Sequence, residues 1–111
     1  MEINTKEISE KMYAVYSEKG IENFCEIVNR FLRKIYDGQT YPENLKGFVN
    51  VSYKGQKEID TNYVYTVHFS EKKLENEKKA KRFIRSCLKF HIKNRNSLNE
   101  AKEKAKRKKV R

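Results

Sequence analysis

The first third of the chain repeats apolar residues at spacings of three and four, the period of an amphipathic helix. Asn4 and Glu7 form a capping-box pattern just ahead of these residues, which predicts a helix over about residues 5–18. Gly20 interrupts the pattern, and a second helix then extends to Asp37-Gly38, where a loop begins. The apolar face of this second helix is the most regular in the chain and comprises Ile21, Phe24, Cys25, Val28, Phe31, Leu32 and Ile35.

The middle of the chain changes to an alternating pattern. The stretches KGFVNVSYKG, at 46–55, and NYVYTVHFS, at 62–70, are rich in Val, Tyr and Phe at alternating positions, which indicates β-strands. A polar link at 54–62 contains Gly55, so we expect an antiparallel hairpin with a long loop. Two strands alone are marginal in water, so helices should cover one face of the hairpin. A homodimer with a four-stranded sheet is a further hypothesis.

A third helix is predicted from the capping residue Ser70 to about Asn94. Its apolar face comprises Ala80, Phe83, Ile84, Cys87, Leu88 and His91. The opposite side carries five basic residues within about 80° of one another and no acidic residue among them. These five are Lys78, Arg82, Arg85, Lys89 and Lys93. Surface helices are normally charged, so a merely solvated face is the alternative to a binding surface.

The last segment is basic and has almost no apolar face. Ser97 and Glu100 repeat the capping-box pattern, and AKEKAKRKKVR follows at 101–111. Alone, such a segment should fray or be disordered. We therefore divide the chain into one small α+β domain, residues 1–96, and a basic helical or disordered tail, residues 97–111. The expected order is helix-helix-strand-strand-helix, with an antiparallel hairpin packed by helices, and a length of 111 residues suits one domain.

Charge is distributed unevenly along the chain. The net charge is +11, but residues 1–70 carry nine Lys/Arg and ten Asp/Glu, whereas residues 71–111 carry seventeen and five. A near-neutral body followed by a strongly basic last third is typical of a protein that meets a polyanion. An acidic protein partner and a general drift to high lysine content are the alternatives.

Candidate catalytic or metal-binding residues are few. His68 and His91 are expected at core or boundary positions, and Cys25 and Cys87 on apolar helix faces, without the local spacing of a metal site. No glycine-rich phosphate loop is visible, so we expect neither an enzyme nor a cofactor, although a nuclease with acids from distant positions stays open. The free cysteines favour a reducing, cytoplasmic setting. Neither a signal peptide nor an apolar run long enough to span a bilayer is visible, so no membrane contact is expected.

The sequence thus favours a non-catalytic nucleic-acid-binding protein, with DNA preferred to RNA because an exposed basic helix suits a major groove. The alternative is an interaction protein that binds and inhibits or recruits an acidic surface of a polymerase, nuclease or defence enzyme. The general character would suit an accessory protein of a phage or another mobile element. Tyr53, Tyr63 and Tyr65 lie on the predicted hairpin. The face that Tyr63 and Tyr65 share with Val67 and Phe69 is expected to be the core side, with base stacking and a protein interface as the alternatives. The predicted contact residues are Lys78, Arg82, Arg85, Lys89, Lys93, Arg95, Lys106, Arg107, Lys108 and Lys109.

Overall fold

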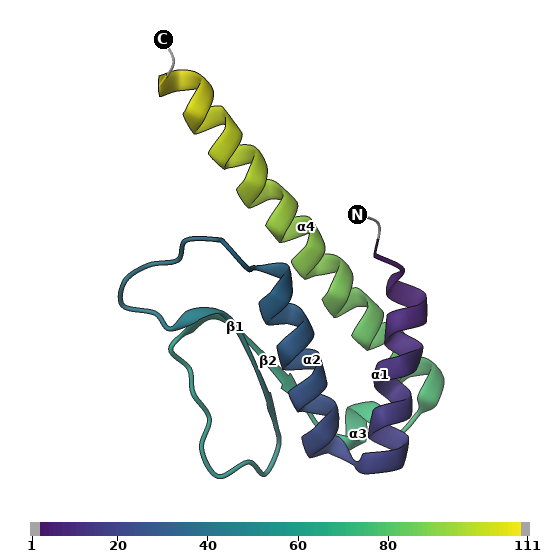
Figure 1. Ribbon diagram of the computed structural model, residues 1–111. Coiled ribbons are helices and arrows are strands. Elements are labelled where there is room, and N and C mark those ends of the chain that lie inside the picture. The colour runs from purple at the N-terminus through teal and green to yellow at the C-terminus, as the bar shows by residue number, and fades with distance from the viewer. Residues whose placement is uncertain (1–2, 110–111) are drawn as a thin grey trace.

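The computed structural model describes the backbone of residues 3–109 and the side chains of residues 3–106. Four α-helices and a two-stranded sheet follow one another along this part of the chain, and the last helix is the longest (Figure 1). The elements are α1 (Thr5–Lys19), α2 (Ile21–Ile35), β1 (Gly47–Tyr53), β2 (Tyr63–Phe69), α3 (Glu71–Leu74) and α4 (Glu77–Lys109). The α+β class predicted from the sequence is therefore confirmed.

The first two helices lie where the apolar spacing predicted them. The Asn4 side chain accepts a hydrogen bond from the Glu7 backbone N–H at 3.0 Å and so caps α1. Gly20 alone separates the two helices, and its φ of 90° lies in a region that residues with a Cβ rarely adopt. This single residue reverses the chain, so α1 and α2 pack side by side as a helical pair (Figure 1).

The two strands also lie at the predicted positions, but they run parallel. Gly47 is opposite Tyr63 and Tyr53 is opposite Phe69, so the predicted antiparallel hairpin is wrong. The reason lies in the link at 54–62. Fully extended, nine residues reach about 30 Å, whereas a seven-residue strand is only about 23 Å long. The link can therefore return beside the strand and start β2 at the same end as β1.

Hydrogen bonds hold both ends of this returning link. The Lys54 N–H donates to the Phe69 carbonyl at 2.9 Å, and the Lys46 N–H donates to the Asn62 carbonyl at 2.7 Å. In the middle, the Asn50 side-chain amide donates to the Asp60 carbonyl at 3.0 Å. A parallel connection usually needs a dozen or more residues because it usually contains a helix. This one is shorter because it contains neither helix nor strand.

The hydrophobic core lies between α2, α4 and one face of the sheet. α2 contacts β1, α1 and α4, and so it is the central helix of the fold. Phe24 of α2 meets Phe69 of β2 edge to face, with ring centroids 4.9 Å apart. The largest fully buried apolar side chains are Phe24, Phe69, Leu32, Leu74, Ile84, Leu88, Val28 and Val49. Burial of so many large side chains supplies the main stabilising term of a small domain.

The predicted third helix is two helices. Ser70 caps α3 as expected, because its hydroxyl oxygen accepts from the Lys73 N–H at 3.3 Å. The chain then breaks after four residues, and the Asn76 side chain caps α4 by accepting from the Lys79 N–H at 3.0 Å. This second cap was not predicted, because Asn76 lies inside a run of charged residues with no apolar period around it.

Helix α4 also continues past the expected end at Asn94, and no new helix starts at Ser97. Leu98 packs against the core, and the Gln39 side-chain amide donates to Asn99 Oδ1 at 2.6 Å. The Lys102 ammonium donates to the Gly38 carbonyl at 3.0 Å. These contacts with the loop after α2 support the helix where its sequence lacks an apolar face. Beyond them α4 projects from the body (Figure 1).

The division at residue 96 therefore falls within one continuous helix. The basic tail differs in composition from the residues before it, but as far as Lys109 it belongs to the same helix. Residues 1–96 as an independent folding unit stay a prediction. Residues 110 and 111 of the predicted tail lie outside the described residues.

Candidate nucleic-acid interface

The outer side of α4 presents the five basic residues that share a helical face. Lys78, Arg82, Arg85, Lys89 and Lys93 are all exposed, and we call them the basic face. The buried residues of the same helix, Ala80, Ile84, Leu88 and His91, lie on the opposite side against the core. At 1.5 Å per residue the basic face is about 22 Å long. Its row of cations is thus presented by a helix that the core holds in place.

No carboxylate neutralises the basic face within the part of the chain that the structure describes. The four ion pairs found there involve other lysines and arginines: Lys11–Glu7, Arg30–Glu26, Lys46–Asp60 and Lys81–Glu77. A row of unneutralised cations on one surface attracts a polyanion, and its field extends about a Debye length into solution.

Acidic residues border the basic face on two sides. Toward α1, Glu10, Glu18 and Glu77 line a shallow depression beside Lys81. Toward the C-terminus, Glu100 and Glu103 fall on the same side of α4 as the basic face, by 100° per residue, and both are exposed. The positive surface therefore has definite borders, and its uninterrupted part ends at Lys93.

The remaining predicted contact residues do not form one continuous surface with the basic face. Arg95 lies about 120° from the centre of the basic face, is half-buried, and donates to the Asn96 side chain at 3.1 Å. Lys106 is exposed on the projecting end of α4. For Arg107, Lys108 and Lys109 the backbone is helical, but their side chains lie outside the described residues. The structure thus brings together five of the ten predicted residues and sets Arg95 apart from them.

A buried polar cluster fixes α4 against the end of α2. Tyr36 Oη and His91 Nδ1 are 2.6 Å apart, and the Asn94 side-chain amide donates to Tyr36 Oη at 3.0 Å. His91 is only 2% exposed, as its predicted place on the apolar face requires. Burial lowers the pKa of His91 to about 4. The imidazole is therefore neutral near pH 7, and its tautomer sets whether Tyr36 Oη or His91 Nδ1 donates the hydrogen bond between them.

The other candidate reactive groups are two cysteines and one histidine. Burial raises the pKa of Cys25 to about 12 and that of Cys87 to about 11, so both thiols are protonated near neutral pH. His68 Nδ1 lies 3.0 Å from the hydroxyl of Ser52, which is fully buried. Within residues 3–109 no group of three or more His, Cys, Asp or Glu is placed to hold a metal ion. None of the described helices has both the length and the apolar character needed to cross a membrane.

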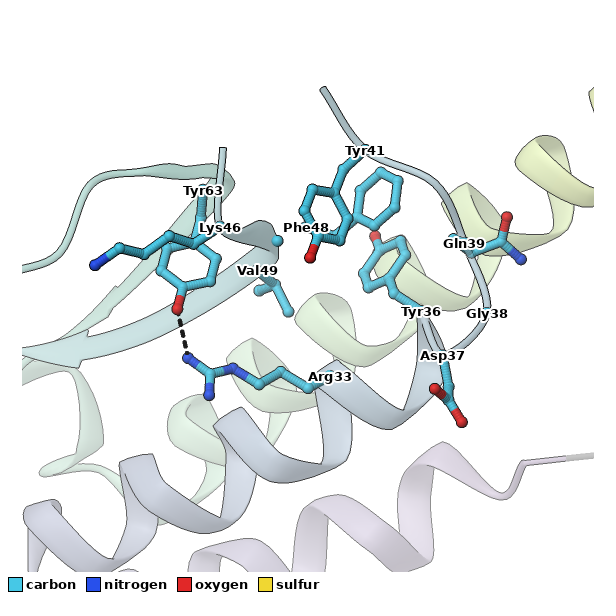
Figure 2. Close-up of a pocket in the computed structure, with 11 residues that line it drawn as sticks. Arg33, Tyr36, Asp37, Gly38, Gln39, Tyr41, Lys46, Phe48, Val49 and Tyr63 are labelled. Carbon is cyan, nitrogen blue, oxygen red and sulfur yellow. Dashed lines mark hydrogen bonds between the residues drawn. The ribbon is translucent and has the colours of Figure 1, made fainter. Parts of the chain in front are cut away.

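A second cationic feature, not predicted from the sequence, lies at the end of α2. A cavity of about 270 Å³ opens between the C-terminal end of α2, the following loop and the first residues of both strands. Arg33 and Tyr63 line one part of it, and Tyr36, Tyr41 and Phe48 line another (Figure 2). We call this space the Arg33 cavity.

The orientation of the strands creates the Arg33 cavity. Tyr63 is opposite Gly47 because β1 and β2 are parallel; in an antiparallel hairpin it would lie near Tyr53, at the other end of the sheet. Arg33 belongs to the polar side of its helix, and its partners Asn50 and Tyr63 are far away in sequence. No local pattern connects these residues, so no signal in the sequence marked the cavity.

Comparison of the chain with protein-family models, with curated proteins and with solved structures finds no match.

Proposed function

We propose that this chain is a non-catalytic nucleic-acid-binding protein that contacts phosphates through the basic face of α4. The observation that carries the proposal is the row of five exposed cations on a helix held by the core, without a carboxylate partner among the described residues. Phosphate contacts need cationic side chains that are long enough to touch the phosphates, and they need no sequence motif, because affinity comes largely from released counterions. The net charge of +11 adds long-range attraction.

DNA is the preferred partner in this proposal. A helix with its side chains is about 10–12 Å across, which is close to the width of the major groove of B-form DNA. The major groove of duplex RNA is too narrow for side chains to read. The projecting end of α4 has the free surface for such an approach (Figure 1). The body-bound part of the helix presents only its outer side, which suits contact with a row of phosphates.

Salt dependence provides the test. Labelled duplex DNA, duplex RNA and single-stranded DNA are titrated with the protein, with anisotropy as readout, between 50 and 200 mM salt. Five phosphate contacts predict a slope of about −4 to −5 for log affinity against log salt on B-form DNA. No binding at 50 mM salt, or an affinity that salt leaves unchanged, would contradict the proposal.

Two exposed aromatic residues favour a second candidate function. Phe83 and Phe90 are 37% and 52% exposed and lie seven residues apart on one side of α4, beside Tyr65 and Phe69 of β2. Aromatic residues next to basic ones are common at protein interfaces. The second candidate is therefore an interaction protein that binds an acidic surface of another macromolecule.

Nothing in the fold bears on a phage origin or on a homodimer, which stay predictions.

A further inference from the structure

The guanidinium of Arg33 is held in place by neutral groups. Its Nη2 donates to Tyr63 Oη at 3.0 Å and to Asn50 Oδ1 at 3.3 Å, and its Cζ lies 5.3 Å from the centre of the Tyr63 ring. Arg30, one turn earlier on the same helix, is instead paired with Glu26 at 3.1 Å. Arg33 thus has a defined hydrogen-bonded position and no salt bridge among the described residues, although the pKa of the nearby Asp60 carboxyl is lowered chiefly by Lys46 and in part by this guanidinium. Its Nε and Nη1 make no hydrogen bond there, and this arrangement suits an anionic ligand.

Three aromatic rings form the other wall of the Arg33 cavity. Tyr36 and Phe48 are stacked with centroids 4.7 Å apart, and Tyr41 meets Phe48 edge to face at 5.8 Å. Tyr36 is buried, whereas Tyr41 is 41% exposed. Figure 2 shows the Arg33 guanidinium on one side of Val49 and the three rings on the other. The Tyr41 ring therefore offers an accessible π-face at the edge of the cavity, supported by the two rings beside it.

Gly47 contributes to the shape of this site. A Cβ at this position would lie 3.2 Å from Cε1 of Tyr63, which is closer than side chains normally approach. The absence of a side chain lets the Tyr63 ring lie against the start of β1, where its hydroxyl accepts the hydrogen bond from Arg33. The close approach of ring and backbone explains why glycine stands at this position.

Among the described residues, the other charged side chains around the cavity form no salt bridge with Arg33. The Lys46 ammonium is 2.7 Å from an Asp60 carboxylate oxygen and points away from the rings. The Asp37 carboxylate also points away from the rings and from Arg33 in Figure 2. The cavity therefore combines one available cation with a set of aromatic rings.

We propose that the Arg33 cavity binds a single nucleotide, with a phosphate on the Arg33 guanidinium and the base stacked on Tyr41. Ligand cavities are commonly 300–1,000 Å³, so the 270 Å³ available admits one ring system with its attached group rather than a longer segment. Aromatic stacking and a guanidinium are the features by which proteins bind unpaired bases and their phosphates. The choice of a nucleotide over other aromatic anions rests on the proposed function, whereas the site itself does not involve the basic face.

Nucleoside 5′-monophosphates are the direct probe of this site. The full chain is titrated with each of them, and ¹⁵N–¹H spectra report the affinity and the residues that shift. We expect shifts for Gln39, Tyr41, Gly47 and Phe48, and affinity at least about tenfold weaker for nucleosides and for inorganic phosphate, since each lacks one half of the interaction. Absence of nucleotide binding to the folded chain would overturn the proposal.

Two variants and one control test the residues. Arg33→Ala should weaken nucleotide binding about tenfold or more, because it removes a charge-assisted contact. Tyr41→Ala, at an exposed position outside the core, should weaken it several-fold through lost stacking. Arg30→Ala is the matched control and should change affinity by less than about twofold, since this arginine lies on the same helix but is paired with Glu26. Equal affinities for wild type and Arg33→Ala would overturn the proposal.

The nucleotide could belong to a nucleic-acid strand or be free in solution. Duplexes with and without an unpaired end distinguish these two sources. If Arg33→Ala weakens binding of a duplex with a single-stranded overhang but not of a blunt duplex, the cavity takes a nucleotide of a strand. If neither duplex is affected while monophosphate binding is lost, it takes a free nucleotide. A failure of the proposed function would look different, because blunt-duplex binding would then be absent while monophosphates still bind.

Discussion

The two cationic regions of this protein differ in shape and in how their charges are held. The basic face of α4 is a convex row of five exposed side chains, none with a carboxylate partner among the described residues. The Arg33 cavity is concave and has one positioned guanidinium beside three aromatic rings. A convex row of charges suits a long polyanion and is indifferent to its bases. A concave aromatic site suits a single nucleotide of such a polyanion.

Tyr36 connects the two regions. Its ring stacks on Phe48 in the wall of the Arg33 cavity, and its hydroxyl is bonded to His91 and Asn94 on the inner side of α4. A change that loosens this cluster should weaken binding at both the basic face and the Arg33 cavity. A change at the surface of one region should weaken binding at that region alone.

The largest effect is expected from reversing charge on the basic face. Arg82→Glu with Arg85→Glu should weaken duplex DNA binding by on the order of 10³-fold at 50 mM salt, because two phosphate contacts become repulsions. Monophosphate binding in the Arg33 cavity should be unchanged. Anisotropy measures the first affinity and ¹⁵N–¹H spectra the second, with circular dichroism to check the fold.

The matched control for that variant is Lys54→Glu with Lys57→Glu. Both lysines are exposed in the link between the strands, and the change in net charge is the same. Duplex affinity should fall by less than about tenfold, since only long-range attraction is reduced. Equal losses in both double variants would mean that net charge, and not the basic face, governs binding.

Acid should destabilise the whole fold through His91. Burial lowers the pKa of His91 to about 4, compared with about 6.5 for an exposed histidine. Above pH 6.5 both the folded and the unfolded chain hold it neutral, and stability is full. As the pH falls toward 4 the unfolded chain binds a proton that the folded chain does not, so the free energy of unfolding decreases by up to about 3 kcal/mol.

Urea unfolding at pH 7 and pH 4.5 measures this loss. His91→Gln should be less stable than wild type at pH 7 but should lose less stability on acidification, because its amide does not titrate. The difference between the two pH profiles isolates His91 from the carboxylates, which are present in both proteins. Identical profiles would show that the buried imidazole is not the source of the pH dependence.

A truncation separates the projecting end of α4 from the part that the body supports. Ending the chain after Lys102 keeps Leu98 on the core and the bond from Lys102 to Gly38. We expect the melting temperature to change by less than about 3 °C, because the removed residues whose side chains are described, 103–106, are all exposed. Duplex affinity should decrease about tenfold through the lost charge. A large drop in melting temperature would show that residues 103–111 support the fold.

The smallest effect is expected from Gly47→Ala. The added Cβ would displace the Tyr63 ring by a few tenths of an ångström and shift the acceptor of the Arg33 hydrogen bond. Monophosphate binding should weaken about threefold, while duplex binding and the melting temperature stay within error. A stronger loss of duplex binding than of monophosphate binding would contradict the separation of the two regions.

The sequence alone determined the elements that depend on local periodicity. The apolar spacing placed α1 and α2 almost to the residue, and alternation placed both strands, because each pattern matches the geometry of one element. The basic face was also predictable, because Lys78 to Lys93 repeat at the period of one helix. The inward position of His91 followed from the same period.

Only the tertiary structure decided how these elements meet. The direction of β2 depends on the path of the link at 54–62, whose polar residues have no period. The continuation of α4 through Ser97 depends on contacts with Gln39 and Gly38, about sixty residues earlier. The Arg33 cavity depends on both the strand direction and the end of α2. Contacts between distant residues leave no mark on local spacing, so these features arise only when the chain is folded.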